Sequence, residues 1–318
     1  MNEQTSEHVS AVAPSGVARL IAHVKAMAPV RTAVVHPCDA LSLGGALDAR
    51  DAGIITPVLV APLAKLRAVA ADFGLDLGDS EIVDVPHSHA AAATAARLAG
   101  KGEVQALMKG SLHSDEYLGA ILAPEAGLRT ERRLTHCYIM QTASYPRPFI
   151  ITDAAINIAP SLEDKADIVR NAIDLAHVIG VPEPKVAILA AVETVNPRMR
   201  STLDAAALCK MADRGQITGG LVDGPLAFDN AVSPEAAQVK GIRSAVGGQA
   251  DVLVVPDLES GNMLAKQLEF LGGAESAGIV MGARVPIVLT SRSDSRTTRL
   301  ASCAIALMLA ERRRAAPP

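Results

Sequence analysis

The stretch from Pro286 to Leu309 reads PIVLTSRSDSRTTRLASCAIALML and holds a complete strand, loop and helix pattern. Residues 286–290 form a short apolar run of the kind that makes a buried strand. A polar segment over residues 291–296 follows, and apolar residues then recur at the spacing of one helix face. That face consists of Leu300, Cys303, Ala304 and Leu307. We therefore predict a strand that passes through a polar loop into a final helix over residues 297–313.

The same alternation of short apolar runs and longer helical patterns extends back to about Val30, which is the rhythm of βαβ units. Apolar residues make up 49% of the chain but aromatic residues only 2%, so Ala, Val, Leu and Ile must build the core. This composition is typical of a parallel sheet that helices cover on both faces, and it predicts an α/β fold. The predicted strands are 32–36, 57–61, 81–85, 105–109, 136–142, 149–152, 185–191, 220–223, 252–256 and 286–290. The predicted helices are 40–52, 63–73, 90–99, 161–179, 198–214, 234–246, 258–271 and 297–313.

Charge and hydropathy exclude two classes of partner. The formal charge is -4, with basic residues scattered along the chain, so no basic stripe is present that could neutralise a nucleic-acid backbone. No apolar run approaches the roughly 20 residues that a membrane-spanning helix needs. We expect a soluble, cytoplasmic protein that binds neither nucleic acid nor membrane. Three consecutive arginines, Arg312 to Arg314, suit the negative end of the final helix dipole, and we interpret them as a solvated helix end.

Metal sites and common nucleotide motifs have no counterpart in the sequence. The four cysteines lie far apart without a C-x-x-C pair, so we expect reduced thiols, most of them small core residues. His87 and His89 have no acidic or Cys partner at metal-ligand spacing. Neither G-x-G-x-x-G nor G-x-x-x-x-G-K-[ST] occurs, which argues against a Rossmann fingerprint and a P-loop. No metal is expected.

A chain of 318 residues exceeds the size of one ordinary domain. The segment Tyr145-Pro146-Arg147-Pro148 forbids regular helix, and we place a boundary near it. The final helix is long enough to pack back on the first half. We predict a first lobe of residues 1–145 plus 292–318 and a second lobe of residues 146–291.

Polar residues follow several predicted strands, which is where open α/β sheets bind ligands. The first segment is residues 291–295, whose backbone N–H groups and helix dipole could meet an anion. The others are residues 152–160, 223–230 and 256–263. Each also has a purely structural interpretation as a helix cap or a tight turn, so the pattern alone leaves both open.

Five ordered motifs together resemble the phosphate acetyl/butyryl transferase family. They are TDAAINIAP, LVDGPLAFDNAVS, PDLESGNMLAKQL, GGAESAGIVMGA and PIVLTSRSDS, and LMKGSLHSDEYL also fits. The SRSDS and DGPLAFDNA forms look closer to the butyryltransferase branch. The resemblance implies reversible transfer of an acyl group between coenzyme A and phosphate, without cofactor or metal. It also implies two three-layer α/β lobes around a cleft, similar to isocitrate and isopropylmalate dehydrogenases, and a homodimer.

The resemblance also implies roles for individual residues. Ser291 and Arg292 match the Ser-Arg pair to which the family assigns oxyanion stabilisation and phosphate binding. No carboxylate stands at the position of the family's acetyl-branch base, so that role stays open between Asp294 and Asp153. Further cleft residues without an assigned role are Thr142, Asn157, Asp223, Asn230 and Asn262.

Two other functions stay open at this point. A decarboxylating dehydrogenase on the same scaffold would use NAD and a divalent ion, and Asp153, Asp223 and Asp257 could supply ligands. A non-catalytic acyl-CoA-sensing module would keep the fold but not the Ser291-Arg292 pair. The SRSDS block argues against the first, and the presence of the pair argues against the second.

Overall fold

The computed structural model describes residues 16–291 and 293–315. Its strands are β1 (Val30–Val35), β2 (Ile55–Ala61), β3 (Glu81–Asp84), β4 (Ala106–Lys109), β5 (Thr135–Gln141), β6 (Phe149–Thr152), β7 (Lys185–Leu189), β8 (Leu221–Leu226), β9 (Val252–Val254), β10 (Glu275–Met281) and β11 (Ile287–Val288). Its α-helices are α1 (Gly16–His23), α2 (Ala40–Asp51), α3 (Leu63–Asp72), α4 (Ser88–Gly100), α5 (Ser114–Leu122), α6 (Leu162–Val178), α7 (Arg200–Asp213), α8 (Phe228–Val232), α9 (Pro234–Val239), α10 (Leu258–Phe270) and α11 (Arg296–Ala315). Two short 3-10 helices, Val24–Ala26 and Pro124–Ala126, complete the elements.

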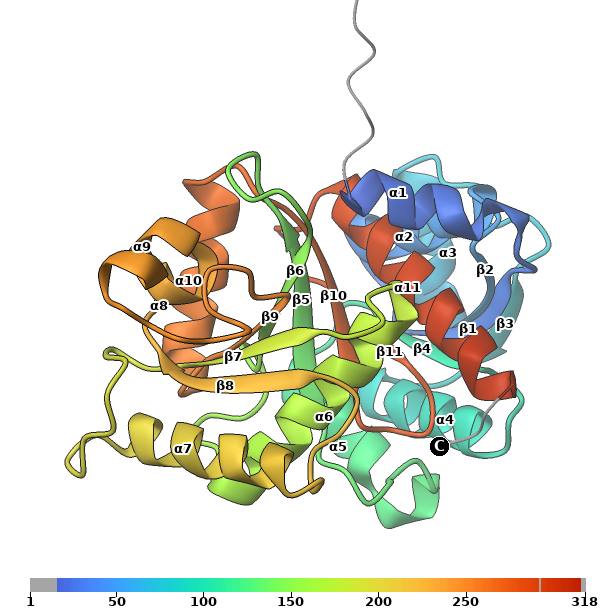
Figure 1. Ribbon diagram of the computed structural model, residues 1–318. Helices are drawn as coiled ribbons and strands as arrows, with labels where there is room; N and C mark the ends of the chain where they lie inside the picture. Colours follow the sequence, from blue (N-terminus) through green and yellow to red (C-terminus); the bar gives the residue numbers. More distant parts are fainter. Residues whose placement is uncertain (1–15, 292, 316–318) are drawn as a thin grey trace, which may run out of the picture.

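The strands of the described chain form a single sheet in the order β3-β2-β1-β4-β11-β10-β5-β6-β9-β7-β8. The sheet is strongly twisted: β7 and β8 run across Figure 1, whereas β5, β6 and β10 run from top to bottom. Three neighbouring pairs, β11–β10, β10–β5 and β5–β6, are antiparallel, and the other pairs are parallel. The sheet is therefore mixed rather than parallel as predicted.

The antiparallel pairs determine on which side of the sheet each strand ends, and so where the polar residues that follow each strand lie. Because an odd number of reversals separates β11 from β6, the strands from β6 to β8 run opposite to β11 and β1–β4. The carboxyl ends of the two parallel groups consequently lie at opposite edges of the sheet. The predicted site residues after β6 and after β11 therefore do not share one edge.

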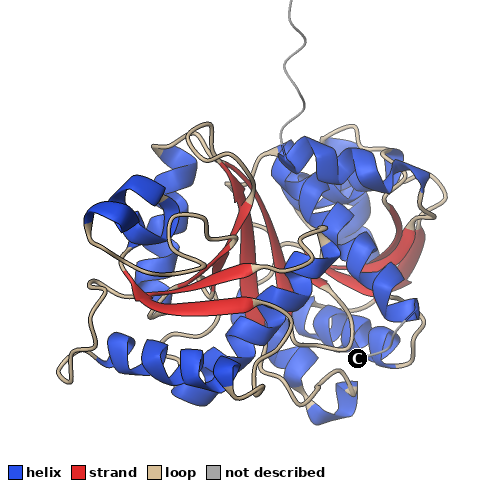
Figure 2. Ribbon diagram, in the orientation of Figure 1, coloured by secondary structure: helices blue, strands red, loops and turns tan. Residues whose placement is uncertain are grey.

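Helices cover both faces of the sheet, as Figure 2 shows. On one face, apolar residues of α1, α2, α3, α6, α7 and α11 form one continuous core with the strands. On the other face the core is divided in two: α4 and α5 pack over β1, β2 and β4, while α8 and α10 pack over β6, β7 and β9. The division falls near β10 and β5, in the middle of the sheet.

All ten predicted strands are present, with ends that shift by a few residues. The strand β10 was missed because its Gly-rich sequence lacks a strand signature. Gly278 is required there by close approach, since a Cβ atom would lie 2.9 Å from Nε2 of His136. Helices α1, α5 and α8 were also missed, and the helix predicted over residues 234–246 ends at Val239.

The final helix packs against α1, α2 and β10. None of the helices in the described ranges is both long and apolar enough to cross a membrane. The four cysteines are free; Cys137 and Cys303 are buried, while Cys38 and Cys209 are half-buried. The prediction of small core residues is thus confirmed in full for two of the four.

Candidate active site

The end of β6 passes into a tight turn built around Asp153. Its Oδ1 atom accepts hydrogen bonds from the backbone N–H groups of Ala155 and Ile156 at 3.0 and 3.1 Å. Its Oδ2 atom accepts from the backbone and side-chain nitrogens of Asn157 at 3.2 and 2.5 Å. The side chain is 1% exposed, and burial raises the pKa of Asp153 although these donors oppose the shift. The carboxylate is therefore occupied in holding the turn.

Asn157 and Asn262 tie this turn to its neighbours. The Asn157 amide donates to Leu134 O at 2.8 Å and accepts from Arg133 Nε at 2.6 Å. From the first turns of α10, Asn262 Nδ2 donates to Ala154 O at 3.2 Å. The structure thus brings Asp153, Asn157 and Asn262 together.

The loop after β11 folds back on itself. Asp294 Oδ2 accepts from Ser291 N at 2.8 Å, and Asp294 N donates to Ser291 O at 3.2 Å. The hydroxyl oxygens of Ser291 and Ser293 lie 3.0 Å apart. Burial raises the pKa of Asp294, which the hydrogen bond from Ser291 partly offsets. The predicted site residue Arg292 lies outside the described residues.

Asp294 and Ser295 have different structural roles in this loop. Ser295 Oγ accepts from Thr298 N at 3.0 Å, so Ser295 caps α11. Asp294 instead braces the loop, and its own carbonyl accepts from Arg299 Nη1 at 2.6 Å. A cavity of about 350 Å³ lies beside the loop and is bounded by Ser293, Thr298, Ser276 and Glu269 among others. The loop therefore borders a hollow whose described lining includes two carboxylates, those of Glu269 and Glu275.

A strip of polar side chains on β5 lies between this loop and the Asp153 turn. Tyr138 stacks edge-on with His136, with ring centroids 4.3 Å apart. Burial raises the pKa of Tyr138 to about 12, and the carboxylates of Asp294, Glu269 and Asp153 add smaller contributions. Tyr138 is thus within electrostatic reach of both predicted groups, although their strands end at opposite edges.

Sequence reasoning missed His136 of this strip and Lys266 of the neighbouring helix α10. Lys266 of α10 pairs with Glu269 at 3.1 Å, and its charge lowers the pKa values of both Asp294 and His136. His136 is fully buried, and burial lowers its pKa to about 3, so the ring is neutral at physiological pH. Within the described chain neither ring nitrogen has a hydrogen-bond partner. The sequence offered only the alternation of His136 and Tyr138 along a strand as a signal.

Asp223 and Asn230 belong to a separate group beside the edge strand β8. Asp223 Oδ1 accepts from Gly224 N at 2.8 Å. Asn230 is buried, and its amide lies 3.4 Å from the Glu193 carboxylate, which Lys240 also contacts at 3.5 Å. Thr142 lies just after β5, with its hydroxyl 3.3 Å from that of Ser144. Across the described ranges, no hydrogen bond joins any of these three predicted residues to residues 291–294.

A family model described as phosphate acetyl/butaryl transferase matches residues 87–307, which is more than half of the chain. The chain belongs to this family. The phosphate acetyltransferase of Rhizobium meliloti is 62% identical over 303 residues, covering 95% of this chain and 96% of the relative. The phosphate butyryltransferase of Clostridium acetobutylicum is 41% identical over 291 residues, covering 92% and 97%.

The crystal structure of a branched-chain phosphotransacylase from Enterococcus faecalis V583 superposes with a TM-score of 0.76 at 29% identity, covering 88% of this chain and 99% of that one. The predicted membership of the phosphate acetyl/butyryl transferase family is confirmed, as is the α/β fold class. Sequence identity does not support the predicted closeness to the butyryltransferase branch. The acetyltransferase from Rhizobium meliloti is more similar to this family member than the clostridial butyryltransferase is.

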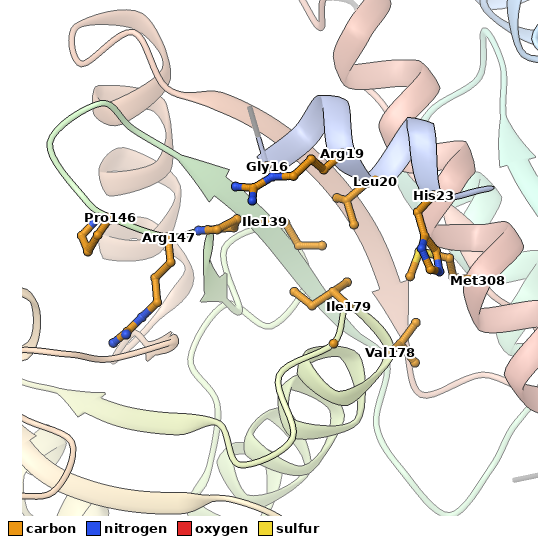
Figure 3. Close-up of a pocket in the computed structure, with 12 residues that line it drawn as sticks. Gly16, Arg19, Leu20, His23, Ile139, Pro146, Arg147, Val178, Ile179 and Met308 are labelled. Atoms are coloured by element: carbon orange, nitrogen blue, oxygen red, sulfur yellow. The ribbon is translucent and has the colours of Figure 1, made fainter. Parts of the chain in front are cut away.

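Figure 3 shows another cavity of this phosphate acyltransferase family member. Its walls are largely apolar, unlike those of the hollow beside residues 291–294. It measures about 410 Å³ and is bounded by aliphatic side chains of α1, the end of α6 and Met308. Arg147 points away from those of α1, and its Nε contacts Asp251 at 2.9 Å. Arg19 and His23 also line this cavity beside its apolar side chains.

The carboxylates that a metal-dependent dehydrogenase would need have other tasks in this family member. Asp257 caps α10 by accepting from Ser260 N at 2.9 Å, and Asp153 and Asp223 each brace their own turn. In the described part of the chain, no three His, Cys, Asp or Glu side chains group as metal ligands. Asp153, Asp223 and Asp257 therefore do not converge on one metal site within the described residues.

Proposed function

We propose that this protein catalyses the reversible reaction acyl-CoA + phosphate = acyl phosphate + CoA on short acyl groups, acetyl to butyryl, with acetyl as the preferred group. The observation that carries the proposal is the 62% identity to a phosphate acetyltransferase along 95% of the chain, including the loop at Ser291. In this reaction the thioester C–S bond breaks and a C–O bond to phosphate forms. No electrons are gained or lost, so coenzyme A and phosphate suffice as substrates, with no cofactor and no metal.

The loop after β11 holds the phosphate in this proposal. Arg292 supplies a planar fork of donors suited to phosphate, a role that rests on the family motif. Ser291, whose hydroxyl is at the same loop, donates to the oxyanion that develops on the acyl carbon. The N-terminal end of α11 adds favourable potential for a negative charge.

Asp294 is the better candidate for the base that takes the proton of the coenzyme A thiol. A thiol with a pKa near 8.5 is mostly protonated at neutral pH, so a nearby base raises the fraction able to attack. Four donor contacts occupy Asp153, whereas Asp294 accepts one described hydrogen bond and is partly exposed. The burial that raises the pKa of Asp294 also makes it more basic than an exposed aspartate.

We further propose that residues 1–145 with 292–318 and residues 146–291 act as two lobes, as in the isocitrate and isopropylmalate dehydrogenases, with the acyl-CoA between them. The divided core on the α10 face supports this arrangement. Asp153, Asn157, Asn262 and Thr142 then line the cleft from one side, and Asp223 and Asn230 bind a more distant part of the substrate. A homodimer in the cytoplasm completes the proposal.

The test is release of free thiol from acetyl-, propionyl- and butyryl-CoA, each with and without inorganic phosphate. We expect phosphate-dependent release that is fastest with acetyl-CoA. Release that does not depend on phosphate would indicate a thioesterase, and no release from any of the three would reject acyl transfer. Faster release from butyryl-CoA would retain the reaction but overturn the acetyl preference.

A further inference from the structure

A positively charged hollow lies at the far end of α11. It measures about 650 Å³, and five arginines contribute to its walls: Arg129, Arg132, Arg284, Arg312 and Arg313. We call it the arginine cavity. Three segments distant in sequence meet there, namely residues 129–132, the turn after β10 and the last turns of α11, with α6 closing one side.

The side chains that line the arginine cavity carry a net positive charge. Glu131 and Asp174 are the acidic side chains in its lining, so five guanidinium groups face two carboxylates. The excess is three positive charges. A cavity of this volume is within the range that binds small ligands in proteins.

Arg313 is the least satisfied of the five. Its Nη1 atom is buried, and in the part of the chain that the structure describes it has no hydrogen-bond partner. Burial lowers the pKa of Arg313 to about 10, and the opposing charge of Asp174 does not compensate. The interpretation of residues 312–314 as a solvated helix end is therefore wrong for Arg313. A partly buried guanidinium with an unpaired nitrogen is costly, and an anion that bonded to this nitrogen would lower that cost.

Three of the other arginines are already held in place. Arg132 donates to Asp174, Arg129 Nε donates to Leu122 O at 2.5 Å, and Arg284 Nη1 donates to Gly127 O at 2.9 Å. Each guanidinium has five N–H donors, so each keeps several for a ligand. Side chains fixed before binding lose less conformational entropy when a ligand arrives.

The arginine cavity is remote from the loop at Ser291. Arg296 and Arg312 stand at the two ends of α11, and a rise of 1.5 Å per residue separates them by about 24 Å. None of the residues that border the hollow beside Ser293 borders the arginine cavity. One anion cannot occupy both.

We propose that the arginine cavity binds a small polyanion carrying two or three negative charges on phosphate or carboxylate groups, at a site separate from that of acyl transfer. The phosphate or carboxylate oxygens pair with Arg312 and Arg313 from α11 and with Arg129 and Arg132 from the facing segment. Three negative charges would neutralise the excess, and bidentate pairing is the geometry in which guanidinium groups bind such oxyanions.

Calorimetric titration of the full chain at matched ionic strength tests the proposal, with inorganic pyrophosphate and citrate as separate probes. The paired variant Arg312→Gln/Arg313→Gln removes the α11 side of the cavity, and Arg129→Gln removes a donor from the opposite side. Arg314→Gln is the matched control, because Arg314 pairs with Glu311 at 2.8 Å and is not part of the lining. Arg292→Ala reports any binding of the probe at the acyl-transfer site.

We expect at least one probe to bind the wild type with a Kd of about 1 mM or below. The paired variant and Arg129→Gln should each weaken binding by about tenfold or more, while Arg314→Gln and Arg292→Ala stay within about twofold. Binding of one probe alone identifies the oxyanion class. Loss of binding in Arg292→Ala with retention in the paired variant would place the anion at the acyl-transfer site and overturn the proposal. No binding of either probe at concentrations of about 10 mM would overturn it as well.

Discussion

The two ends of α11 both carry arginines, yet they differ in what the helix itself contributes. At the start of α11, the proposed anion site combines the positive end of the helix dipole with the charge of Arg292. At its end, Arg312 to Arg314 lie near the negative pole of the dipole, which takes up part of their charge. Only the first end also presents serine hydroxyls beside the arginine. A cluster of positive charge therefore indicates an anion site, and the neighbouring groups indicate whether chemistry can follow.

The largest expected effect distinguishes the two ends directly. Arg292→Ala should lower kcat/KM for phosphate by about 10²-fold or more, because it removes a charged fork from the reacting anion. Arg314→Gln, at the other end, should leave kcat/KM within about twofold. Steady-state rates over a range of phosphate concentrations measure both. An unchanged response to phosphate in Arg292→Ala would remove this residue from the site.

The next effect concerns the base at the start of α11. If Asp294 takes the thiol proton when CoA attacks acyl phosphate, its ionised form is active in that direction. The rate of acyl-CoA formation from acyl phosphate and CoA should therefore rise with pH through a pKa above that of an ordinary aspartate. Asp294→Asn should lower kcat by about 10²-fold and abolish that rise. The measurement is the pH profile of both enzymes over about pH 4 to pH 8, a range that spans aspartate titration. A full rate with an unaltered profile would make Asp294 a loop brace only.

A stability effect separates the Asp153 turn from an ordinary helix cap. Asp153→Asn should lower the free energy of unfolding by about 2 kcal/mol, because an amide nitrogen would face donors that now meet a carboxylate oxygen. Asp257→Asn is the matched control, since Asn caps helices about as well as Asp, and it should change stability by less than about 0.5 kcal/mol. Urea unfolding measures both. Equal losses would show that the turn has no special dependence on its carboxylate.

The smallest effect belongs to the end of α11. Arg313→Gln should raise the free energy of unfolding by about 1 kcal/mol in buffer without polyanions, because it removes a buried unpaired charge. Arg314→Gln should not raise it. Thermal unfolding at low ionic strength compares the two variants. Destabilisation by Arg313→Gln would mean that its charge is already compensated.

Local patterns predicted most of the secondary structure but not the direction of strands. Buried aliphatic runs identified β1 through β9 and β11, because a strand that is covered on both faces consists almost entirely of aliphatic residues. The strands β5 and β6 are consecutive, but β5 also pairs antiparallel with the distant strand β10. Because that long-range pair leaves no local signal, the opposite placement of Asp153 and Ser291 could not be predicted. The strand β10 was hidden because a glycine is needed where His136 approaches.

Residues of the candidate site could be proposed from the sequence where they belong to a family motif. Residues that come near the site only through tertiary packing could not. Motifs identified Ser291, Asp153, Asn157 and Asn262, and the structure joins the last three. Tyr138 and Lys266 carry no motif signal, because their relation to Asp294 arises only when α10 packs on β5. The partial burial of Arg313 likewise follows from the approach of α6 and residues 129–132 to the end of α11.

The most direct test of the central claim is to count products. Purified enzyme is supplied with acetyl-CoA and phosphate, free thiol is titrated, and acetyl phosphate is trapped with hydroxylamine in the same samples. We predict one acetyl phosphate for each thiol released, and neither product when phosphate is omitted. Thiol release without a matching acyl phosphate would contradict phosphate as the acceptor and with it the role of the loop that begins at Ser291.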